Sequence, residues 1–159
     1  LQLVRALGGR SIAITSDAKK TDFLKRAGAH HVVVAKDGAF GAEVWRLTDK
    51  RGVDIALENV GPTLPETLRA LTSGGTAVVL GNIGGDAVPV APGLLIGRRL
   101  RVQGSGMAPV EEVRQAIALL AAGLITPVIS AVVGFPEASK AHRMLEARAV
   151  EGRVLLEGW

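Results

Sequence analysis

Residues 53–80 read VDIALENVGPTLPETLRALTSGGTAVVL, and this stretch carries the clearest indication of a fold class. Residues 53–57 are mostly apolar and predict a strand, and the Asn-Val-Gly-Pro segment at 59–62 predicts a turn. Residues 64–71 predict a helix, which ends before a glycine pair. Residues 76–80 are an apolar run of the kind found in strands that a parallel sheet buries on both faces. The stretch therefore predicts a β–α–β unit.

The same alternation of strands and helices continues on both sides of this unit. It recurs with a spacing of about 25 residues, which is the signature of a parallel, doubly wound sheet. The sequence therefore predicts an α/β fold of the Rossmann-like type. The predicted strands are residues 11–15, 30–34, 53–57, 76–80, 100–103, 128–133 and 153–156, and the predicted helices are residues 17–27, 38–49, 64–71, a short one near 94–96, 109–122 and 136–148.

The chain opens on a helical segment, residues 1–7, which a glycine pair closes in the manner of a helix C-terminus. In a dinucleotide-binding β–α–β unit, a strand and a glycine-rich loop come before the corresponding helix. We therefore expect a doubly wound sheet that is truncated at its N-terminus and lacks its first strand and its phosphate-binding loop. We expect residues 1–135 to form an incomplete nucleotide-binding domain. Residues 136–159 are expected to add a helix and a strand that pack toward a missing catalytic domain.

Composition excludes several function classes. The 159 residues carry a net charge of +4 and include three Phe, two Trp and no Tyr, so base stacking on nucleic acid has little support. No apolar run reaches the length of a membrane span, and we expect no membrane partner. The chain has no Cys, which is compatible with a cytoplasmic protein.

Seven short strings, in this order and spacing, resemble the medium-chain dehydrogenase/reductase family, which includes zinc-type alcohol dehydrogenases and quinone oxidoreductases. The chain resembles the second half of such an enzyme. The strings are LGGR at 7–10, FLKRAGA at 23–29, GVDIALENVG at 52–61, LRALTSGG at 68–75, VLGN at 79–82, AHRMLE at 141–146 and GRVLL at 152–156.

The resemblance implies a six-stranded sheet in the order 3-2-1-4-5-6, of which strands two to six are visible here. Strand one would lie at the centre, so we expect residues 1–159 alone to be unstable or molten. The resemblance also implies a homodimer that pairs through the edge strand at 100–103.

The end of the strand at 11–15 is the position where relatives select the cofactor. Members that prefer NAD place an Asp there, and the matching residue here is Thr15. Ser16 can donate to a 2′-phosphate, and Lys19 or Lys20 can supply positive charge, which favours NADP(H) over NAD(H). Asp17 follows directly after Ser16 and leaves NAD(H) as the alternative cofactor. In a second interpretation, Ser16 and Asp17 only cap the next helix.

The ends of later strands supply the other candidate cofactor contacts. Val60 with Gly61 and Gly81 with Asn82 follow two of these strands, where glycine allows close approach of the backbone to a ligand. The resemblance implies that the backbone at Gln103, Gly104 and Ser105 meets the nicotinamide carboxamide, and that Arg153 approaches the pyrophosphate. Ordinary turns and a solvated arginine are the alternative interpretations.

No metal site is predicted in these residues. His30 and His31 are adjacent on a strand and point to opposite faces, so they cannot both bind one metal ion from that strand. In relatives with catalytic zinc, the ligands lie upstream of the residues present here, so zinc in a missing domain stays possible. The catalytic residues are unknown for the same reason.

The resemblance implies the cofactor-binding part of an NADP(H)-dependent oxidoreductase with a small-molecule substrate. The expected reaction is reduction of an activated C=C bond in a quinone, an enone or an enoyl thioester, and residues 1–159 alone are expected to be inactive. The alternatives are a zinc-dependent alcohol dehydrogenase and a non-catalytic nucleotide-binding or interaction module. A short-chain dehydrogenase needs a Tyr-x-x-x-Lys pair, and these residues contain no Tyr.

Overall fold

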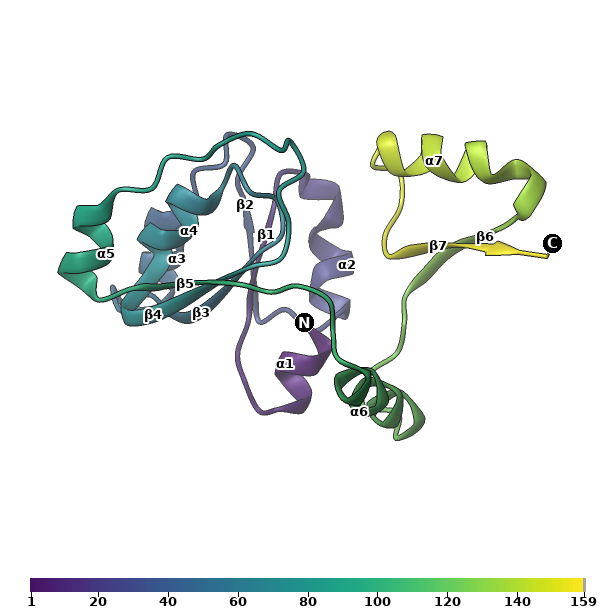
Figure 1. The fold of residues 1–159 in the computed structure, drawn as a ribbon, viewed down its shortest axis with the longest axis horizontal. Helices are drawn as coiled ribbons and strands as arrows, with labels where there is room; N and C mark the ends of the chain where they lie inside the picture. Colours follow the sequence, from purple (N-terminus) through teal and green to yellow (C-terminus); the bar gives the residue numbers. More distant parts are fainter. Residues whose placement is uncertain (159) are drawn as a thin grey trace.

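The computed structural model describes residues 1–158 and shows parallel strands alternating with helices (Figure 1). The last residue of the predicted segment 136–159 lies outside the described residues. The strands are β1 (Ile12–Thr15), β2 (His31–Val34), β3 (Val53–Glu58), β4 (Leu71–Val79), β5 (Arg101–Gly104), β6 (Ile129–Gly134) and β7 (Arg153–Glu157). The helices are α1 (Gln2–Ala6), α2 (Thr21–Arg26), α3 (Gly41–Leu47), α4 (Leu64–Ala70), α5 (Pro92–Arg98), α6 (Val110–Ala121) and α7 (Ala138–Glu146), with short 3-10 turns η1 (Ala18–Lys20) and η2 (Phe135–Glu137).

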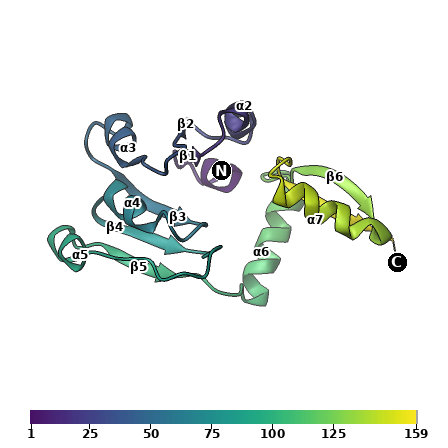
Figure 2. The ribbon, with the colours of Figure 1, turned by 90° about the horizontal axis from the view of Figure 1, so that it is seen from above.

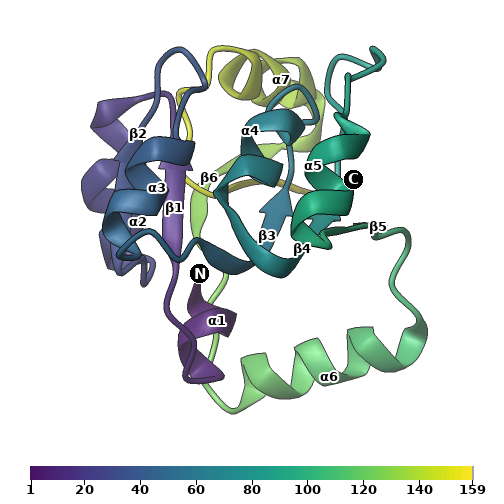
Figure 3. The same cartoon turned by 90° about the vertical axis from the view of Figure 1, so that its left-hand side faces the viewer.

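The strands form three groups, and every pairing is parallel. β1 pairs with β2, β4 pairs with β3 and β5, and β6 pairs with β7. β1 and β3 point in the same direction, and within residues 1–158 no strand pairs between them (Figure 3). The prediction of an α/β fold with a parallel sheet is confirmed. In the implied order 3-2-1-4-5-6, β1 and β2 correspond to strands two and three, and β3, β4 and β5 correspond to strands four, five and six. The neighbours within both groups therefore match that order.

Most predicted elements appear within a few residues of their expected bounds, with two informative differences. The helix expected at 17–27 divides into η1 and α2, and the Asp17 side chain caps η1 by accepting from the Lys19 amide over 2.9 Å. β4 begins at Leu71 rather than at residue 76. It pairs first with Val53, and the register then shifts over the glycine pair before the regular ladder resumes at Thr76.

A shared apolar cluster connects the β1–β2 pair to the β3–β4–β5 sheet. Its buried residues come from β2, the loop after it, α3 and α4, and are Val33, Ala35, Phe40, Val44 and Ala70. Ile12 of β1 and Val53 of β3 pack against this cluster from the two sides. The two groups of strands are therefore joined through α3 and α4 rather than by backbone pairing. A second cluster, Leu68, Leu71 and Ala77, holds α4 against β4.

Several apolar surfaces in the described part of the chain are not covered. Ile55 and Leu57 on β3 are 64% and 58% exposed. Helix α6 lies below the sheet in the view of Figure 3 and beside it in Figure 2. Two of its apolar side chains, Val113 and Ile117, are also exposed. Among residues 1–158, no helix combines the length and apolar character needed to cross a bilayer.

Candidate functional site

The turns that follow β3 and β4 lie side by side at one edge of the sheet. Because the strands are parallel, their carboxyl ends share that edge, which is where doubly wound folds bind ligands. The first turn contains Val60 and Gly61, and the second contains Gly81 and Asn82. The Ile83 amide donates to the Val60 carbonyl over 2.9 Å and ties the second turn to the first.

Close packing explains why both turns contain glycine. Gly61 has φ +96°, and a Cβ at this position would lie 2.8 Å from the Cα of Asn82. A Cβ on Gly81 would lie 2.6 Å from the carbonyl oxygen of Asn59. Any side chain at either position would force the two turns apart.

The end of β5 extends the same edge. Gln103 and Gly104 stand beside Val78 and Val79 of β4, and the Ser105 amide donates to the Val79 carbonyl over 2.9 Å. The structure therefore brings together seven of the residues predicted for cofactor binding. They are Val60, Gly61, Gly81, Asn82, Gln103, Gly104 and Ser105.

Glu58, the last residue of β3, organises this edge and was missed by the sequence analysis as a site residue. Its side chain is buried, with only 3% of the residue exposed. One carboxylate oxygen, Oε1, accepts from the amides of Val60 and Gly61 at 2.9 Å each. The Thr63 hydroxyl lies 2.8 Å from Oε1, and the Thr67 hydroxyl donates to Oε2 over 2.6 Å. A buried carboxylate with this many donors satisfies its hydrogen-bonding capacity inside the protein.

These contacts also set the ionisation of Glu58. Burial alone would raise the pKa of the Glu58 carboxyl, but hydrogen bonds from Thr67, Gly61, Val60 and Thr63 together outweigh burial and hold the pKa below its ordinary value. The group is therefore a carboxylate at neutral pH.

We expect the stability advantage of the wild type over Glu58→Gln to be largest near neutral pH and to shrink in acid. Because the native pKa is lowered, this contribution is fully present above the ordinary glutamate value of about 4.3. It is lost as the pH falls through that value toward the native pKa. Urea unfolding of both intact proteins from about pH 7 to about pH 3 measures the difference. A difference that stays constant over this range would contradict the lowered pKa.

The predicted cofactor-selecting residues lie just after β1. The Thr15 hydroxyl accepts from the Asp17 amide over 3.1 Å, so it is engaged in a local turn. Lys20 Nζ donates to the Val150 carbonyl over 3.5 Å. Ser16 and Lys19 are exposed. Ser16 and Lys19 are thus the two of these side chains that the structure leaves facing solvent.

Arg153 lies in a different part of the molecule. It begins β7, where its amide donates to the Val128 carbonyl over 2.8 Å, and its side chain is exposed. The β6–β7 pair stands apart from β3, β4 and β5 (Figures 1 and 2). The structure therefore does not bring Arg153 to the edge formed by the other predicted residues.

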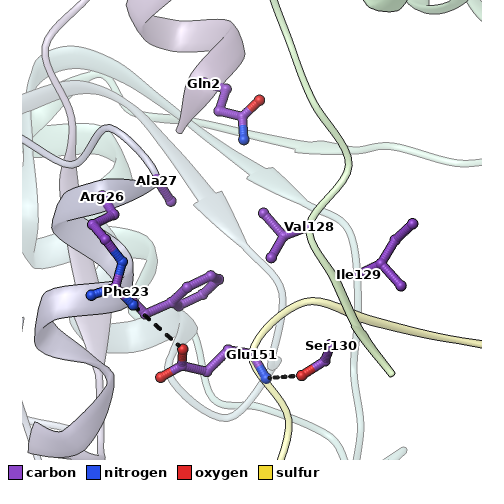
Figure 4. Close-up of a pocket in the computed structure, with 8 residues that line it drawn as sticks. All are labelled: Gln2, Phe23, Arg26, Ala27, Val128, Ile129, Ser130 and Glu151. Atoms are coloured by element: carbon purple, nitrogen blue, oxygen red, sulfur yellow. Dashed lines mark hydrogen bonds and ion pairs between the residues drawn. The ribbon is translucent and has the colours of Figure 1, made fainter. Parts of the chain in front are cut away.

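An open hollow separates α1 and α2 from β6 (Figure 4). Its volume is about 350 Å³, and Arg26 and Glu151 approach across it with a separation of 3.8 Å. None of the residues predicted for cofactor binding lines it. The lining residues are Gln2, Phe23, Arg26, Ala27, Val128, Ile129, Ser130 and Glu151.

Comparison with known proteins identifies the family to which the chain belongs. The family model described as zinc-binding dehydrogenase matches residues 1–122, which include both turns and the end of β5. The chain belongs to the medium-chain dehydrogenase/reductase family. The resemblance drawn from the sequence strings is thereby confirmed.

Curated members of the family are similar to nearly the whole chain. Acryloyl-coenzyme A reductase of Sulfurisphaera tokodaii is 26% identical over 99% of this chain and 46% of its own length. NAD-dependent alcohol dehydrogenase of Saccharolobus solfataricus is 30% identical over 98% of the chain and 46% of its own length. Quinone oxidoreductase 1 of Escherichia coli is 28% identical over 98% of the chain and 51% of its own length. The chain thus spans about half the length of the curated relatives it matches.

Solved structures of similar proteins agree with the fold. The crystal structure of AibC superposes with a TM-score of 0.90 at 39% identity and covers 98% of this chain and 44% of its own. Crotonyl-CoA carboxylase/reductase AntE, in complex with NADP, gives a TM-score of 0.90 at 27% identity. The match covers 98% of this chain and 45% of the AntE chain.

The description of the matching family includes zinc, which proteins bind through three or four convergent side chains. Within residues 1–158, no group of three His, Cys, Asp or Glu side chains is placed so that it could hold a metal ion.

Proposed function

We propose that the intact protein is an NADP(H)-dependent oxidoreductase and that this chain forms its cofactor-binding part. The observation that carries the proposal is the edge where the turns after β3 and β4 interlock around Gly61 and Gly81. Ligands of doubly wound sheets bind at this position. The nicotinamide cofactor supplies the hydride when bound, while residues of the chain hold and orient it.

In this proposal, different parts of the edge meet different parts of the cofactor. Ser16 and Lys19 bind the 2′-phosphate of the adenosine ribose, because they are a hydroxyl donor and a cation exposed after β1. The backbone from Gln103 to Ser105 meets the nicotinamide carboxamide. The interlocked turns support the dinucleotide between these ends.

The preference for NADP(H) rests on the chemistry of the β1 end. Thr15 carries no charge that would repel a 2′-phosphate. The carboxylate that follows in the sequence, Asp17, accepts from the Lys19 amide and caps η1. The NADP complex of the similar AntE protein supports this choice, whereas the similar Saccharolobus solfataricus enzyme is named NAD-dependent.

We propose reduction of an activated C=C bond as the reaction, with hydride added to the β-carbon and a proton to the α-carbon. The similarity to acryloyl-coenzyme A reductase and to quinone oxidoreductase supports this class. The similarity to an alcohol dehydrogenase supports oxidation of an alcohol as the second candidate. A non-catalytic module is the third candidate, and it would bind the nucleotide without turnover.

Steady-state turnover of the intact protein tests this proposal. An enoyl thioester, a quinone and a primary alcohol are each assayed with the phosphorylated and the unphosphorylated cofactor. We expect reduction of the thioester or the quinone, with kcat/KM for NADPH at least about tenfold above that for NADH, a difference of about 1.4 kcal/mol. A preference for NADH would overturn the cofactor proposal, and turnover of the alcohol alone would overturn the reaction class.

A charge variant in the same assay locates the 2′-phosphate contact. Ser16→Asp places a carboxylate beside the proposed phosphate position, so we expect KM for NADPH to rise about tenfold through charge repulsion, while KM for NADH changes little. Ser73→Asp adds the same charge at an exposed position near the start of β4, at the opposite end of that strand from the proposed cofactor edge, and serves as the matched control. Equal effects of the two variants would contradict the assignment of Ser16.

We further propose that residues 136–159 pack against a catalytic domain and that Arg153 reaches the pyrophosphate when that domain is in place. The exposed apolar side chains Val132, Leu155 and Leu156 of the β6–β7 pair support such a contact.

For the assembly, we propose a homodimer in which β5 continues the sheet across a two-fold axis, since β5 pairs with β4 on one side and its residues are exposed. A cytoplasmic location agrees with the absence of Cys from the sequence.

A further inference from the structure

We propose that Glu58 is a positioning residue, whose carboxylate holds the turns after β3 and β4 in the arrangement that the cofactor meets. This inference rests on the proposed function, because it concerns the same edge of the sheet. Glu58 itself is buried, with only 3% of the residue exposed.

The side chain of Glu58 fixes the first turn. Its Oε1 atom accepts from the amides of Val60 and Gly61, which are successive residues of that turn. Two amides that share one acceptor are constrained in position and in direction, so the turn cannot rotate without breaking both bonds. The Thr63 hydroxyl, just before α4, lies 2.8 Å from Oε1 and 3.0 Å from Oε2, and the Thr67 hydroxyl donates to Oε2.

The main chain of Glu58 fixes the second turn. Its carbonyl oxygen accepts from the Leu80 amide over 2.8 Å and lies 3.4 Å from the Gly81 amide. Glu58 therefore contacts both turns, the first through its side chain and the second through its backbone. Val60 also connects the two turns, because its carbonyl oxygen accepts from the Ile83 amide.

The two turns are also tightly packed, so a change in one is transmitted to the other. The Val60 carbonyl accepts from Ile83, and Gly61 lies against Asn82 with no room for a Cβ. If the carboxylate is removed, the amides of Val60 and Gly61 lose their acceptor and the first turn must rearrange to find new partners. That rearrangement displaces Asn82 and distorts the surface on which the dinucleotide lies.

The test compares four variants of the full-length protein. Glu58→Leu removes both acceptors, and Glu58→Asp keeps the charge but withdraws it by one methylene group. Glu58→Gln keeps an oxygen acceptor at nearly the same position and is the conservative rescue. Thr67→Val removes only a donor to Oε2 and leaves the turn amides bound to Oε1, so it is the control for lost stability alone.

Dissociation constants for NADPH and NADH, kcat at saturating cofactor and melting temperatures are measured for each variant. We expect Glu58→Leu and Glu58→Asp to raise the dissociation constant for NADPH by about tenfold or more, Glu58→Gln by about threefold or less, and Thr67→Val by less than about twofold. The melting temperature is expected to fall in all four. If Glu58→Leu fails to fold, the comparison of Glu58→Asp with Thr67→Val decides the question.

Two results would overturn the inference. One is a dissociation constant unchanged in Glu58→Asp, and the other is a loss of binding that follows the melting temperature across all variants, including Thr67→Val. If the wild type binds neither NADPH nor NADH, the proposed function itself fails, and this inference fails with it. If the wild type binds the cofactor and all four variants bind it with the same dissociation constant, only the role of Glu58 is contradicted.

Discussion

Replacing Gly52 by alanine will destabilise the protein by about 3 kcal/mol or more, because two effects combine at this position. Gly52 is buried with φ +85°, a left-handed conformation that a side chain disfavours. A Cβ here would also lie 2.7 Å from the Leu71 carbonyl carbon, 2.7 Å from the Thr72 amide nitrogen and 2.8 Å from the Ala70 carbonyl oxygen. These are backbone atoms at the end of α4 and the start of β4, so they cannot move aside as a flexible side chain would.

Gly74→Ala separates these two effects. Gly74 has nearly the same backbone angle, φ +79°, but nothing lies within 4 Å of the position a Cβ would take. We expect it to lose only about 1 kcal/mol, the conformational part. Urea unfolding of the intact wild type and both variants gives the two free energies. Equal losses in the two variants would show that the contact between Gly52 and β4 contributes nothing.

Residues 1–159 expressed alone will show no cooperative thermal transition and poorly dispersed amide spectra. Their accessible surface is 10811 Å² for 16.5 kDa, whereas a compact monomer of this mass exposes about 7,600 Å². β1 and β3 face each other without a strand paired between them, and Ile55 and Leu57 of β3 are exposed. Uncovered apolar area and unpaired strand edges both reduce the free energy available to oppose the entropy of the unfolded chain.

Calorimetry and a proton–nitrogen correlation spectrum of the 159-residue chain measure both properties, with the intact protein as the reference. The intact protein is expected to melt cooperatively under the same conditions. A sharp transition and well-dispersed spectra for residues 1–159 alone would show that the α3–α4 contact is sufficient to hold the two groups of strands together.

The elements of the fold could be predicted because their signals are local. The apolar run at 76–80 and the turn that contains Gly61 each reflect only a few neighbouring residues, and both lie where they were expected. The early start of β4 at Leu71 could not be predicted, since it depends on pairing with Val53, far away in the sequence.

Glu58 shows what local patterns miss. On the sequence it is one acidic residue at the end of a strand, without an obvious partner. Thr63 and Thr67 are four residues apart and therefore share one face of a helical turn, which is a signal that could have indicated a polar contact. Nothing in that spacing specifies that the shared face meets Glu58, because this depends on how α4 packs on β3.

The amino-acid sequence by itself determined that this chain alternates parallel strands with helices, and its ordered strings identified the family. The tertiary structure alone decided that Glu58 lies buried beneath two turns, that Gly61 and Gly81 have no room for a side chain, and that Arg153 stands apart from them. The reason is physical. Hydrophobic periodicity and turn preferences act over a few residues, whereas burial, hydrogen-bond partners and close contacts depend on which distant segments the packed chain brings together.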